Sequence, residues 1–406
     1  MVGAKAVCGP AGRPKRVSSP AVTASKLKLL QRILLAGASA ALVLFCIELP
    51  ALLAVLDYRT LIGPYHMWWA PNVKDPELLA IHRPGAHQQG EARGGDAASS
   101  YDIPAADLTS FRWNVTYDRN GFRNPQDFRQ ADIVVIGDSF VEGLTVSDAE
   151  LMTSQLAQLA GKSTANLGQS TYGPLQEQIV FRRYGLPLEP RVVVWMFFEG
   201  NDLDDVIAYR HEMEHPASFV HAFWARSFTR SAYLELKRVV HPPVRPPGIR
   251  RAGIFQAANG KPVTAYFMYR SKPLSAQQLQ ALGGTVATMA SVEKLCAAHQ
   301  TQLLFVFVPA KFRVLHDFCR FPSESEARNW TPNDMPEQLQ RGLQTAAPAV
   351  EFLDLTPYLV AATERGELPY YPDDEHWSPA GHKIAAQAIG EYLSRSQHAM
   401  SDRAAR

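Results

Sequence analysis

A serine and a histidine that lie far apart in this 406-residue chain have the residue types that acyl transfer requires. Ser139 follows a short run of apolar, β-branched residues in the sequence Gly-Asp-Ser, and a serine hydroxyl becomes a nucleophile only when a base stands beside it. His376 can be that base, because an imidazole titrates close to neutral pH. The two residues predict a nucleophile and its general base, provided that the fold brings them together.

Two neighbouring aspartates compete to orient this histidine. A carboxylate that accepts a hydrogen bond from the ring fixes its tautomer and stabilises its protonated form. Asp373 precedes His376 by three residues and Asp374 precedes it by two, so either can turn back onto the ring within one loop. The residues alone leave this choice open.

The charge that develops on a substrate oxygen during acyl transfer needs nearby N–H donors. The expected donors are the backbone N–H groups of Ser139 and Gly168 and the side-chain amide of Asn201, because each of these residues follows a short apolar run. Gly168 could instead be a turn glycine, and Asn201 could cap a helix. Loss of one such donor costs about 3 kcal/mol of transition-state stabilisation.

A strand–helix alternation beyond residue 130 supplies the elements that must position these residues. The predicted strands are short and mostly apolar, and they cover residues 133–136, 165–167, 192–198, 303–308 and 350–355. Helical spacing covers residues 147–159, 175–184, 275–299 and 379–393. This alternation predicts a parallel sheet between two layers of helices, with the functional site at the carboxyl ends of the strands.

Residues 131–396 resemble the SGNH (GDSL-type) hydrolase superfamily. The resemblance rests on four blocks in order: Gly-Asp-Ser at 137–139, a glycine at 168, Glu-Gly-Asn-Asp at 199–202, and Asp-Asp-Glu-His at 373–376. It implies a flavodoxin-like three-layer α/β/α sandwich and an esterase or acyltransferase that uses no cofactor and no metal. Because the family spacing is Asp-x-x-His, it also favours Asp373 as the triad carboxylate, with Asp374 as its competitor.

Two further segments are similar to relatives that O-acetylate exported polysaccharides. These segments are Pro-Ala-Lys at 309–311 and His-Trp-Ser at 376–378. The relatives place the Asp/His pair before the serine, whereas in this chain it follows. The similarity implies that a sugar hydroxyl can replace water as the acceptor.

The N-terminal region has the composition of a membrane anchor. Residues 1–32 carry Lys and Arg but no Asp or Glu and form the expected cytoplasmic tail, and residues 33–56 are apolar and long enough to span a bilayer. Glu48 lies near the far end of this span, and Trp68 and Trp69 follow it at a distance that suits an interfacial aromatic belt. We therefore predict a retained inner-membrane helix rather than a cleaved signal peptide, with the rest of the chain in the periplasm.

The remaining segments are less regular. Residues 57–130 form a juxtamembrane region in which the Gly-, Ala- and polar-rich stretch 84–100 predicts a flexible linker, and residues 397–406 predict a polar tail. Residues 206–274 interrupt the strand–helix alternation as an insertion with an amphipathic helix near 219–233. We expect this helix to pack its aromatic face on the core; the alternative is a helix that lies on the membrane beside the anchor.

Two other patterns have weaker chemical meanings. His-Glu-Met-Glu-His at 211–215 matches the zinc-protease pattern, but a charged Glu214 and the following Pro216 favour a surface segment. Cys296 and Cys319 flank one predicted strand and could form a disulfide, while Cys8 and Cys46 should be free.

Composition restricts the function classes. With 46% hydrophobic and 20% charged residues the chain is globular, four cysteines exclude a disulfide-dense scaffold, and a mildly acidic body beyond the basic tail does not suit a nucleic-acid binder. We predict a membrane-anchored serine esterase that cleaves O-acyl esters of a cell-envelope carbohydrate or lipid. The alternatives are an O-acyltransferase that acts on an exported polysaccharide, with a membrane acyltransferase as a possible partner, and a non-catalytic envelope assembly module.

Overall fold

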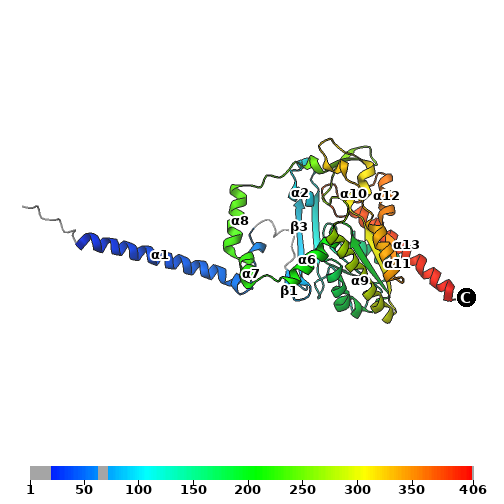
Figure 1. Ribbon diagram of the computed structural model, residues 1–406, viewed down its shortest axis with the longest axis horizontal. Coiled ribbons are helices and arrows are strands. Elements are labelled where there is room, and N and C mark those ends of the chain that lie inside the picture. Colours follow the sequence, from blue (N-terminus) through cyan, green and yellow to red (C-terminus); the bar gives the residue numbers. More distant parts are fainter. Residues whose placement is uncertain (1–19, 63–71, 405–406) are drawn as a thin grey trace, which may run out of the picture. The chain divides into compact units, whose positions relative to one another are not determined.

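The computed structural model describes residues 20–62 and 72–404, which form two compact units (Figure 1). Of the described residues, one unit contains 20–62 and 218–240, and the other contains 72–217 and 241–404. The predicted interfacial residues Trp68 and Trp69, together with Cys8 and most of the predicted tail 1–32, lie outside the described residues.

The larger unit is built on a five-stranded parallel sheet, as the sequence predicts. Its strands are β5 (Ile133–Gly137), β6 (Thr164–Gly168), β7 (Val192–Phe198), β10 (Gln302–Val308) and β12 (Glu351–Asp354). Their order is β12-β10-β7-β5-β6, and every neighbouring pair is parallel. Numbered by their order along the chain and read from β6 to β12, the strands follow the flavodoxin-like order 2-1-3-4-5. The chain adds β6 on one side of β5 and then adds β7, β10 and β12 on the other side.

Helices cover both faces of this sheet and complete the three-layer sandwich. Strand β7 is apolar at every position, since alternate residues serve two cores: Trp195 and Phe197 pack on one side, and Val194 and Met196 on the other. The first core contains residues of α5 (Pro174–Val180), α9 (Ala276–Ala298) and α11 (Met335–Ala346). The second contains residues of α3 (Ser139–Glu142), α4 (Met152–Ala160), α10 (Lys311–Leu315), α12 (Thr356–Glu364) and α13 (Pro379–Ala404).

Small antiparallel sheets surround the sandwich. They are the hairpin β1 (Asn72–Asp75) and β2 (Leu79–His82), the ribbon β3 (His87–Arg93) and β4 (Ser110–Thr116), and the sheet of β8 (Ala252–Gln256), β9 (Pro262–Tyr266) and β11 (Cys319–Arg320). The stretch 84–100 is therefore not a flexible linker, because it forms β3 and the short helix α2 (Asp96–Ser100). The ribbon needs Gly90, since a Cβ there would overlap the ring of Trp113 on β4.

The smaller unit consists of a long N-terminal helix and two helices from the insertion. Helix α1 (Pro20–Leu52) is long and apolar enough from Lys26 to Leu52 to cross a membrane, and it ends four residues before the predicted limit of 56. Helices α7 (Phe219–Arg226) and α8 (Phe228–Val240) contact α1. These helices therefore belong to the unit of α1, whereas we expected this part of the insertion to pack on the core of the larger unit.

The rest of the insertion belongs to the larger unit. It supplies α6 (Asp202–Glu214), which starts at the end of β7, and strands β8 and β9. Helix α13 continues through the predicted polar tail as far as Ala404. Cys46, Cys296 and Cys319 are free, so the structure contains no disulfide between Cys296 and Cys319.

Candidate active site

The turn between β5 and α3 presents Ser139 at the carboxyl edge of the sheet. Gly137 ends β5 with φ of +157°, and a Cβ there would lie 2.6 Å from the side chain of Val141. Asp138 is the N-cap of α3, because its carboxylate accepts a hydrogen bond from the backbone N–H of Phe140 (3.0 Å). Ser139 is thus the first residue of a helix, where its own N–H has no helical carbonyl partner.

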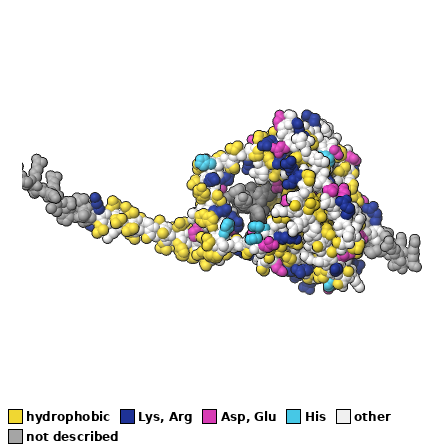
Figure 2. Space-filling view, viewed as in Figure 1, with side chains coloured by type: hydrophobic (Ala, Val, Ile, Leu, Met, Phe, Trp, Pro, Cys, Tyr) yellow, Lys and Arg dark blue, Asp and Glu magenta, His cyan; other side chains and the backbone are white. Residues whose placement is uncertain are grey.

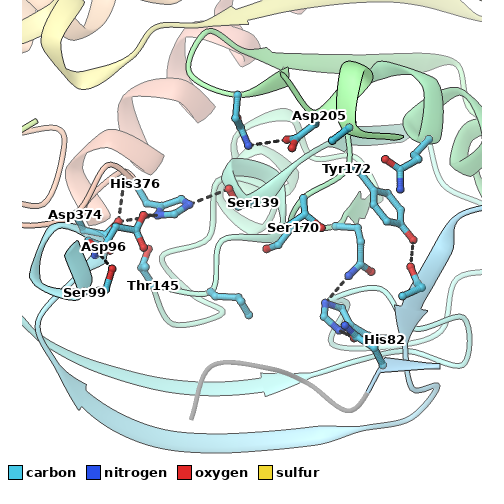
Figure 3. Close-up of a pocket in the computed structure, with 18 of the residues that line it drawn as sticks. His82, Asp96, Ser99, Ser139, Thr145, Ser170, Tyr172, Asp205, Asp374 and His376 are labelled. Atoms are coloured by element: carbon cyan, nitrogen blue, oxygen red, sulfur yellow. Dashed lines mark hydrogen bonds and ion pairs between the residues drawn. The ribbon is translucent and has the colours of Figure 1, made fainter. Parts of the chain in front are cut away.

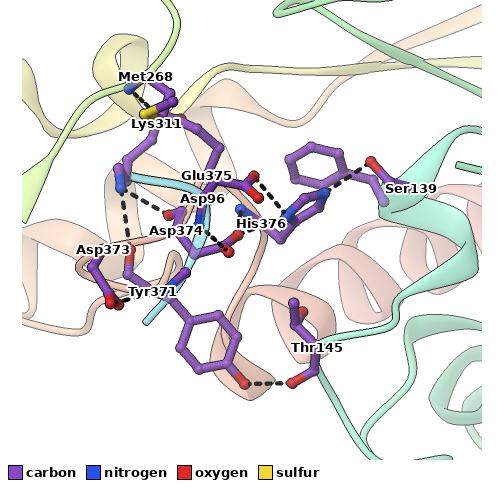
Figure 4. Close-up of polar contacts among 12 residues, drawn as sticks. Asp96, Ser139, Thr145, Met268, Lys311, Tyr371, Asp373, Asp374, Glu375 and His376 are labelled. Atoms are coloured by element: carbon purple, nitrogen blue, oxygen red, sulfur yellow. Dashed lines mark hydrogen bonds and ion pairs between the residues drawn. The ribbon is translucent and has the colours of Figure 1, made fainter. Parts of the chain in front are cut away.

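His376 lies against Ser139 although the two residues are separated by most of the domain (Figure 4). Its Nε2 is 2.8 Å from the Ser139 Oγ, and its Nδ1 is 2.6 Å from the Oδ1 of Asp374. The backbone N–H of His376 also donates to the same carboxylate oxygen (2.8 Å), which fixes the ring and the carboxylate in one loop. The arrangement can move a proton from the serine hydroxyl to the ring while the carboxylate stabilises the charged form.

The carboxylate beside the ring is that of Asp374, and Asp373 points elsewhere. Asp373 is fully buried and accepts hydrogen bonds from the backbone N–H groups of Gly95 and Thr109 (both 3.0 Å) and from the Thr109 hydroxyl. These hydrogen bonds fix the segment around α2 to the loop of residues 371–376, which we call the histidine loop. The family spacing that favoured Asp373 does not identify the residue in contact with the ring of His376.

Lys311 fixes the histidine loop through hydrogen bonds to its backbone carbonyls. It is fully buried at the start of α10, and its Nζ donates to the backbone carbonyls of Tyr371 (3.2 Å), Pro372 (3.2 Å) and Asp374 (2.8 Å). Burial lowers the pKa of Lys311, although the nearby carboxylates of Glu375 and Asp374 oppose this effect. The lysine of the Pro-Ala-Lys segment thus positions the loop and does not touch Ser139.

A second carboxylate near the ring was not predicted. The Asp96 Oδ2 on α2 lies 3.5 Å from the His376 Nδ1, and its side chain is 47% exposed. The stretch 84–100 lacks an apolar period, so no signal in the sequence connects it to the catalytic block.

Electrostatics at the ring favour its protonated form. Burial alone would disfavour the charge, but the Asp374 carboxylate and its hydrogen bond, together with Asp96 and Asp138, outweigh burial and raise the pKa of His376 to about 10. Burial likewise opposes ionisation of Asp374, but the His376 charge and hydrogen bonds lower its pKa to about 2. The direction of both shifts follows from one buried ion pair.

The predicted oxyanion donors are only partly in position. The N–H of Gly168 donates to the Asn166 side chain (2.8 Å), and a Cβ at Gly168 would lie 2.5 Å from the Glu142 nitrogen. This glycine therefore serves close packing, and its N–H is not directed at a substrate. Asn201 lines the cavity in front of Ser139; its Nδ2 donates one hydrogen to Asp205 (2.8 Å) and carries a second.

Ser139 and His376 open onto a cavity of about 1720 Å³ (Figure 3). Its walls come from the β1–β2 hairpin, α2, the loop after β6 and the start of α6. Among the lining residues, His82 is itself buried and bonds Glu142 (2.7 Å) and Asn72 (2.7 Å), so it is part of the wall.

Two other histidines, the buried His382 and the exposed His211, make contacts of their own. His382 is buried, and the N–H of Met152 donates to its Nδ1 (3.3 Å). Burial, together with the charges of Arg123 and His376, lowers the pKa of His382 to about 3. His211 stacks on the exposed His215 at the end of α6. Within residues 20–62 and 72–404, the only group of three candidate metal ligands is Asp96, Asp374 and His376, so the zinc-protease pattern gathers no third ligand there.

Two sequence comparisons match parts of the chain. Residues 265–406 match a family model described as "SGNH hydrolase-like domain, acetyltransferase AlgX". A protein of Pseudomonas putida described as "Probable alginate O-acetylase AlgJ" is 28% identical over 116 residues. That alignment covers 29% of this chain and 28% of the relative, so the chain spans less than a third of the curated protein it matches.

Solved structures overlap with the chain at low similarity. A GDSL-like lipase from Bacteroides thetaiotaomicron is 16% identical, with 65% of this chain and 88% of that chain covered and a TM-score of 0.34. An acetyl xylan esterase from the rumen bacterium Butyrivibrio proteoclasticus is 10% identical, with 68% and 66% covered and a TM-score of 0.34.

Proposed function

We propose that the chain is an enzyme of the SGNH type, in keeping with the family model matched by residues 265–406. It would transfer O-acyl groups through a covalent intermediate on Ser139, with a hydroxyl of an exported polysaccharide as the acceptor. The observation that carries this proposal is the chain of hydrogen bonds from Ser139 through His376 to Asp374. In this proposal His376 is the general base, Asp374 orients it, and Asn201 with the Ser139 N–H stabilises the oxyanion.

The reaction has two halves that use the same groups. The Ser139 Oγ attacks the acyl carbon of the donor ester while its proton passes to the His376 Nε2, and collapse of the tetrahedral intermediate expels the donor alcohol, which takes that proton. An acceptor hydroxyl then attacks the acyl-enzyme, gives its proton to His376, and leaves as the new ester while the Ser139 oxygen regains the proton. Water in place of the sugar hydroxyl would make the same machinery an esterase.

Transfer is favoured over hydrolysis by the sequence comparisons. Both the matching family description and the matching curated relative are named for acetyl transfer. A cavity of about 1720 Å³ exceeds the roughly 300–1,000 Å³ of a typical small-molecule pocket, which suits a segment of a polymer. Hydrolysis stays the second candidate, because His376 is 22% exposed and water can therefore approach the base.

The proposed setting is the periplasmic face of the inner membrane. Helix α1 is long and apolar enough to span, and its N-terminal flank carries Lys26, Lys28 and Arg32. Positive charge remains on the cytoplasmic side, so the hydrolase unit would be outside the cytoplasm. An exported polysaccharide is then within reach, and a membrane acyltransferase is a possible source of the acyl group.

A test that separates the candidates uses the full chain in detergent or nanodiscs with an activated acetyl ester and an oligosaccharide acceptor. We expect O-acetylated oligosaccharide that disappears in Ser139→Ala and persists in Ser99→Ala, which removes an exposed hydroxyl beside the same cavity. Released acetate with no acetylated sugar would favour the esterase. Failure of the wild type to consume the donor would favour a non-catalytic assembly module.

A further inference from the structure

The apolar face of α8 is exposed and is covered by none of the residues that the structure describes, 20–62 and 72–404. Tyr233, Leu236 and Val240 lie at helical spacing along one side, with Val239 beside them. Their exposed fractions are 62%, 63%, 58% and 66%, respectively. The opposite side carries Arg238 and the buried Ser231, so the helix turns its apolar side outward and part of its polar side inward.

The start of α8 is fixed to the end of the proposed membrane span. The carboxylate of Glu48 on α1 accepts hydrogen bonds from the backbone N–H groups of Phe228 (3.0 Å) and Thr229 (2.7 Å), the first residues of α8. The Arg226 guanidinium donates to the Ala51 carbonyl at 2.6 Å. The Tyr58 ring packs edge-on against Phe228, with centroids 5.4 Å apart.

These bonds explain how a carboxylate is tolerated at the end of an apolar helix. A helix N-terminus presents free N–H groups and a partial positive charge, so α8 compensates the charge of Glu48 where it would leave water. The same bonds place the first turn of α8 at the level of residue 48, which is the boundary between the apolar span and the aqueous phase.

We propose that α7 and α8 lie in the headgroup–acyl boundary of the bilayer, with the exposed side chains of Tyr233, Leu236, Val239 and Val240 in contact with lipid. This proposal concerns membrane attachment; it rests on α1 spanning the membrane and not on the acyl chemistry. The apolar side chains of α7 and α8 continue the exposed apolar surface of α1 (Figure 2). On α7 they are Phe219, Val220 and Trp224, which are 62%, 72% and 50% exposed.

A lipid interface suits this surface better than a protein partner. The surface is continuous with a helix whose most apolar stretch has no buried residue and so requires lipid along its whole circumference. Tyr233 and Trp224 are side chains that favour the interfacial zone, and Lys237 borders the apolar side with a stem long enough to reach headgroups.

Photo-crosslinking of the full chain in nanodiscs tests the proposal. The probe is benzoylphenylalanine, introduced as Val239→benzoylphenylalanine and, on the polar side of the same helix, Arg238→benzoylphenylalanine. We expect lipid adducts, detected by mass spectrometry, to be several-fold more abundant from position 239. Leu159→benzoylphenylalanine, at a residue 57% exposed on α4 of the hydrolase unit, should give none.

A probe on the span makes the outcomes distinguishable. Leu34→benzoylphenylalanine, at a residue 64% exposed on α1, reports whether the anchor is in the bilayer. Lipid adducts at 34 combined with protein adducts at 239, or with equal labelling at 238 and 239, would overturn the interfacial proposal while leaving the anchor intact. Absence of lipid adducts at 34 would overturn both, and neither outcome concerns Ser139.

Discussion

At the scale of single residues, the site depends on which of two adjacent carboxylates faces the imidazole. Asp374 contacts the ring at 2.6 Å, while Asp373 bonds Gly95 and Thr109 from a fully buried position. The two adjacent carboxylates bond different groups, so a one-residue error in assigning the partner exchanges the proposed catalytic role for a structural one. Only the path of the loop, held by Lys311, resolves the choice.

Substitution of the two aspartates should therefore have different consequences. Asp374→Asn is expected to lower kcat by roughly 10³–10⁴-fold with little loss of folded protein, because an amide supports the wrong ring tautomer. Asp373→Asn should instead lower the free energy of unfolding by about 1–3 kcal/mol, because it disturbs a buried acceptor. Single-turnover kinetics and denaturant unfolding of both variants measure the difference; equal kinetic losses would contradict the assignment.

The pH dependence of acylation follows from the raised pKa of His376. A ring with a pKa of about 10 is protonated at neutral pH and cannot accept the Ser139 proton, so kcat/KM should still be rising with pH above pH 8. Asp96→Asn removes one of the charges that raise this pKa, so it should shift the rise toward lower pH and increase activity at pH 7. Asp317→Asn, at a side chain 80% exposed, is the matched charge control. A profile centred near 6.5 in the wild type would refute this account.

Substitutions of two predicted oxyanion donors, Asn201 and Gly168, should also differ in whether they affect activity or stability. Asn201→Ala is expected to reduce kcat by about 10²–10³-fold through loss of a donor. Gly168→Ala should lower the free energy of unfolding by about 1–3 kcal/mol, because its new methyl group would lie 2.5 Å from the Glu142 nitrogen. Thermal unfolding and initial rates test both; an inactive but fully stable Gly168→Ala would restore that glycine as a donor.

At the scale of elements, the sequence predicts the regular parts of the site and misses the irregular ones. Strands β5, β6 and β7 are buried on both faces, so their continuous apolar runs identify them and locate Ser139, Gly168 and Asn201 at their ends. Strand β3 alternates between exposed and half-buried residues and carries no apolar period that a sequence could reveal. Because α2 follows β3 directly, Asp96 was missed with it.

The clamp between α10 and the histidine loop gives a prediction at this scale. Lys311→Met should preserve the apolar volume of the side chain but remove three hydrogen bonds to the loop carbonyls. We expect an unfolding free energy lower by about 1–3 kcal/mol and a reduced kcat with an altered pH profile, since His376 and Asp374 would lose their fixed geometry. Unchanged stability and kinetics in Lys311→Met would remove Lys311 from the positioning role.

At the scale of the whole molecule, the chain combines a flavodoxin-like hydrolase unit with a separate unit that contains the apolar helix α1. The division was only partly visible in the sequence, because the segments that join α1 come from an insertion nearly 170 residues downstream. An amphipathic pattern predicts that α7 and α8 have an apolar face, but not what covers it. Contact with α1 at Glu48 supplies that information.

The acyl-enzyme itself is the most direct test of the central proposal. The full chain would be mixed with an activated acetyl ester, acid-quenched within the first turnover, digested and examined by mass spectrometry, with Ser139→Ala and Ser99→Ala in parallel. We predict one acetyl group on the peptide that contains Ser139 in the wild type and in Ser99→Ala, and none in Ser139→Ala. Turnover of the donor by Ser139→Ala at the wild-type rate, or an acetyl group carried on another residue, would contradict the account.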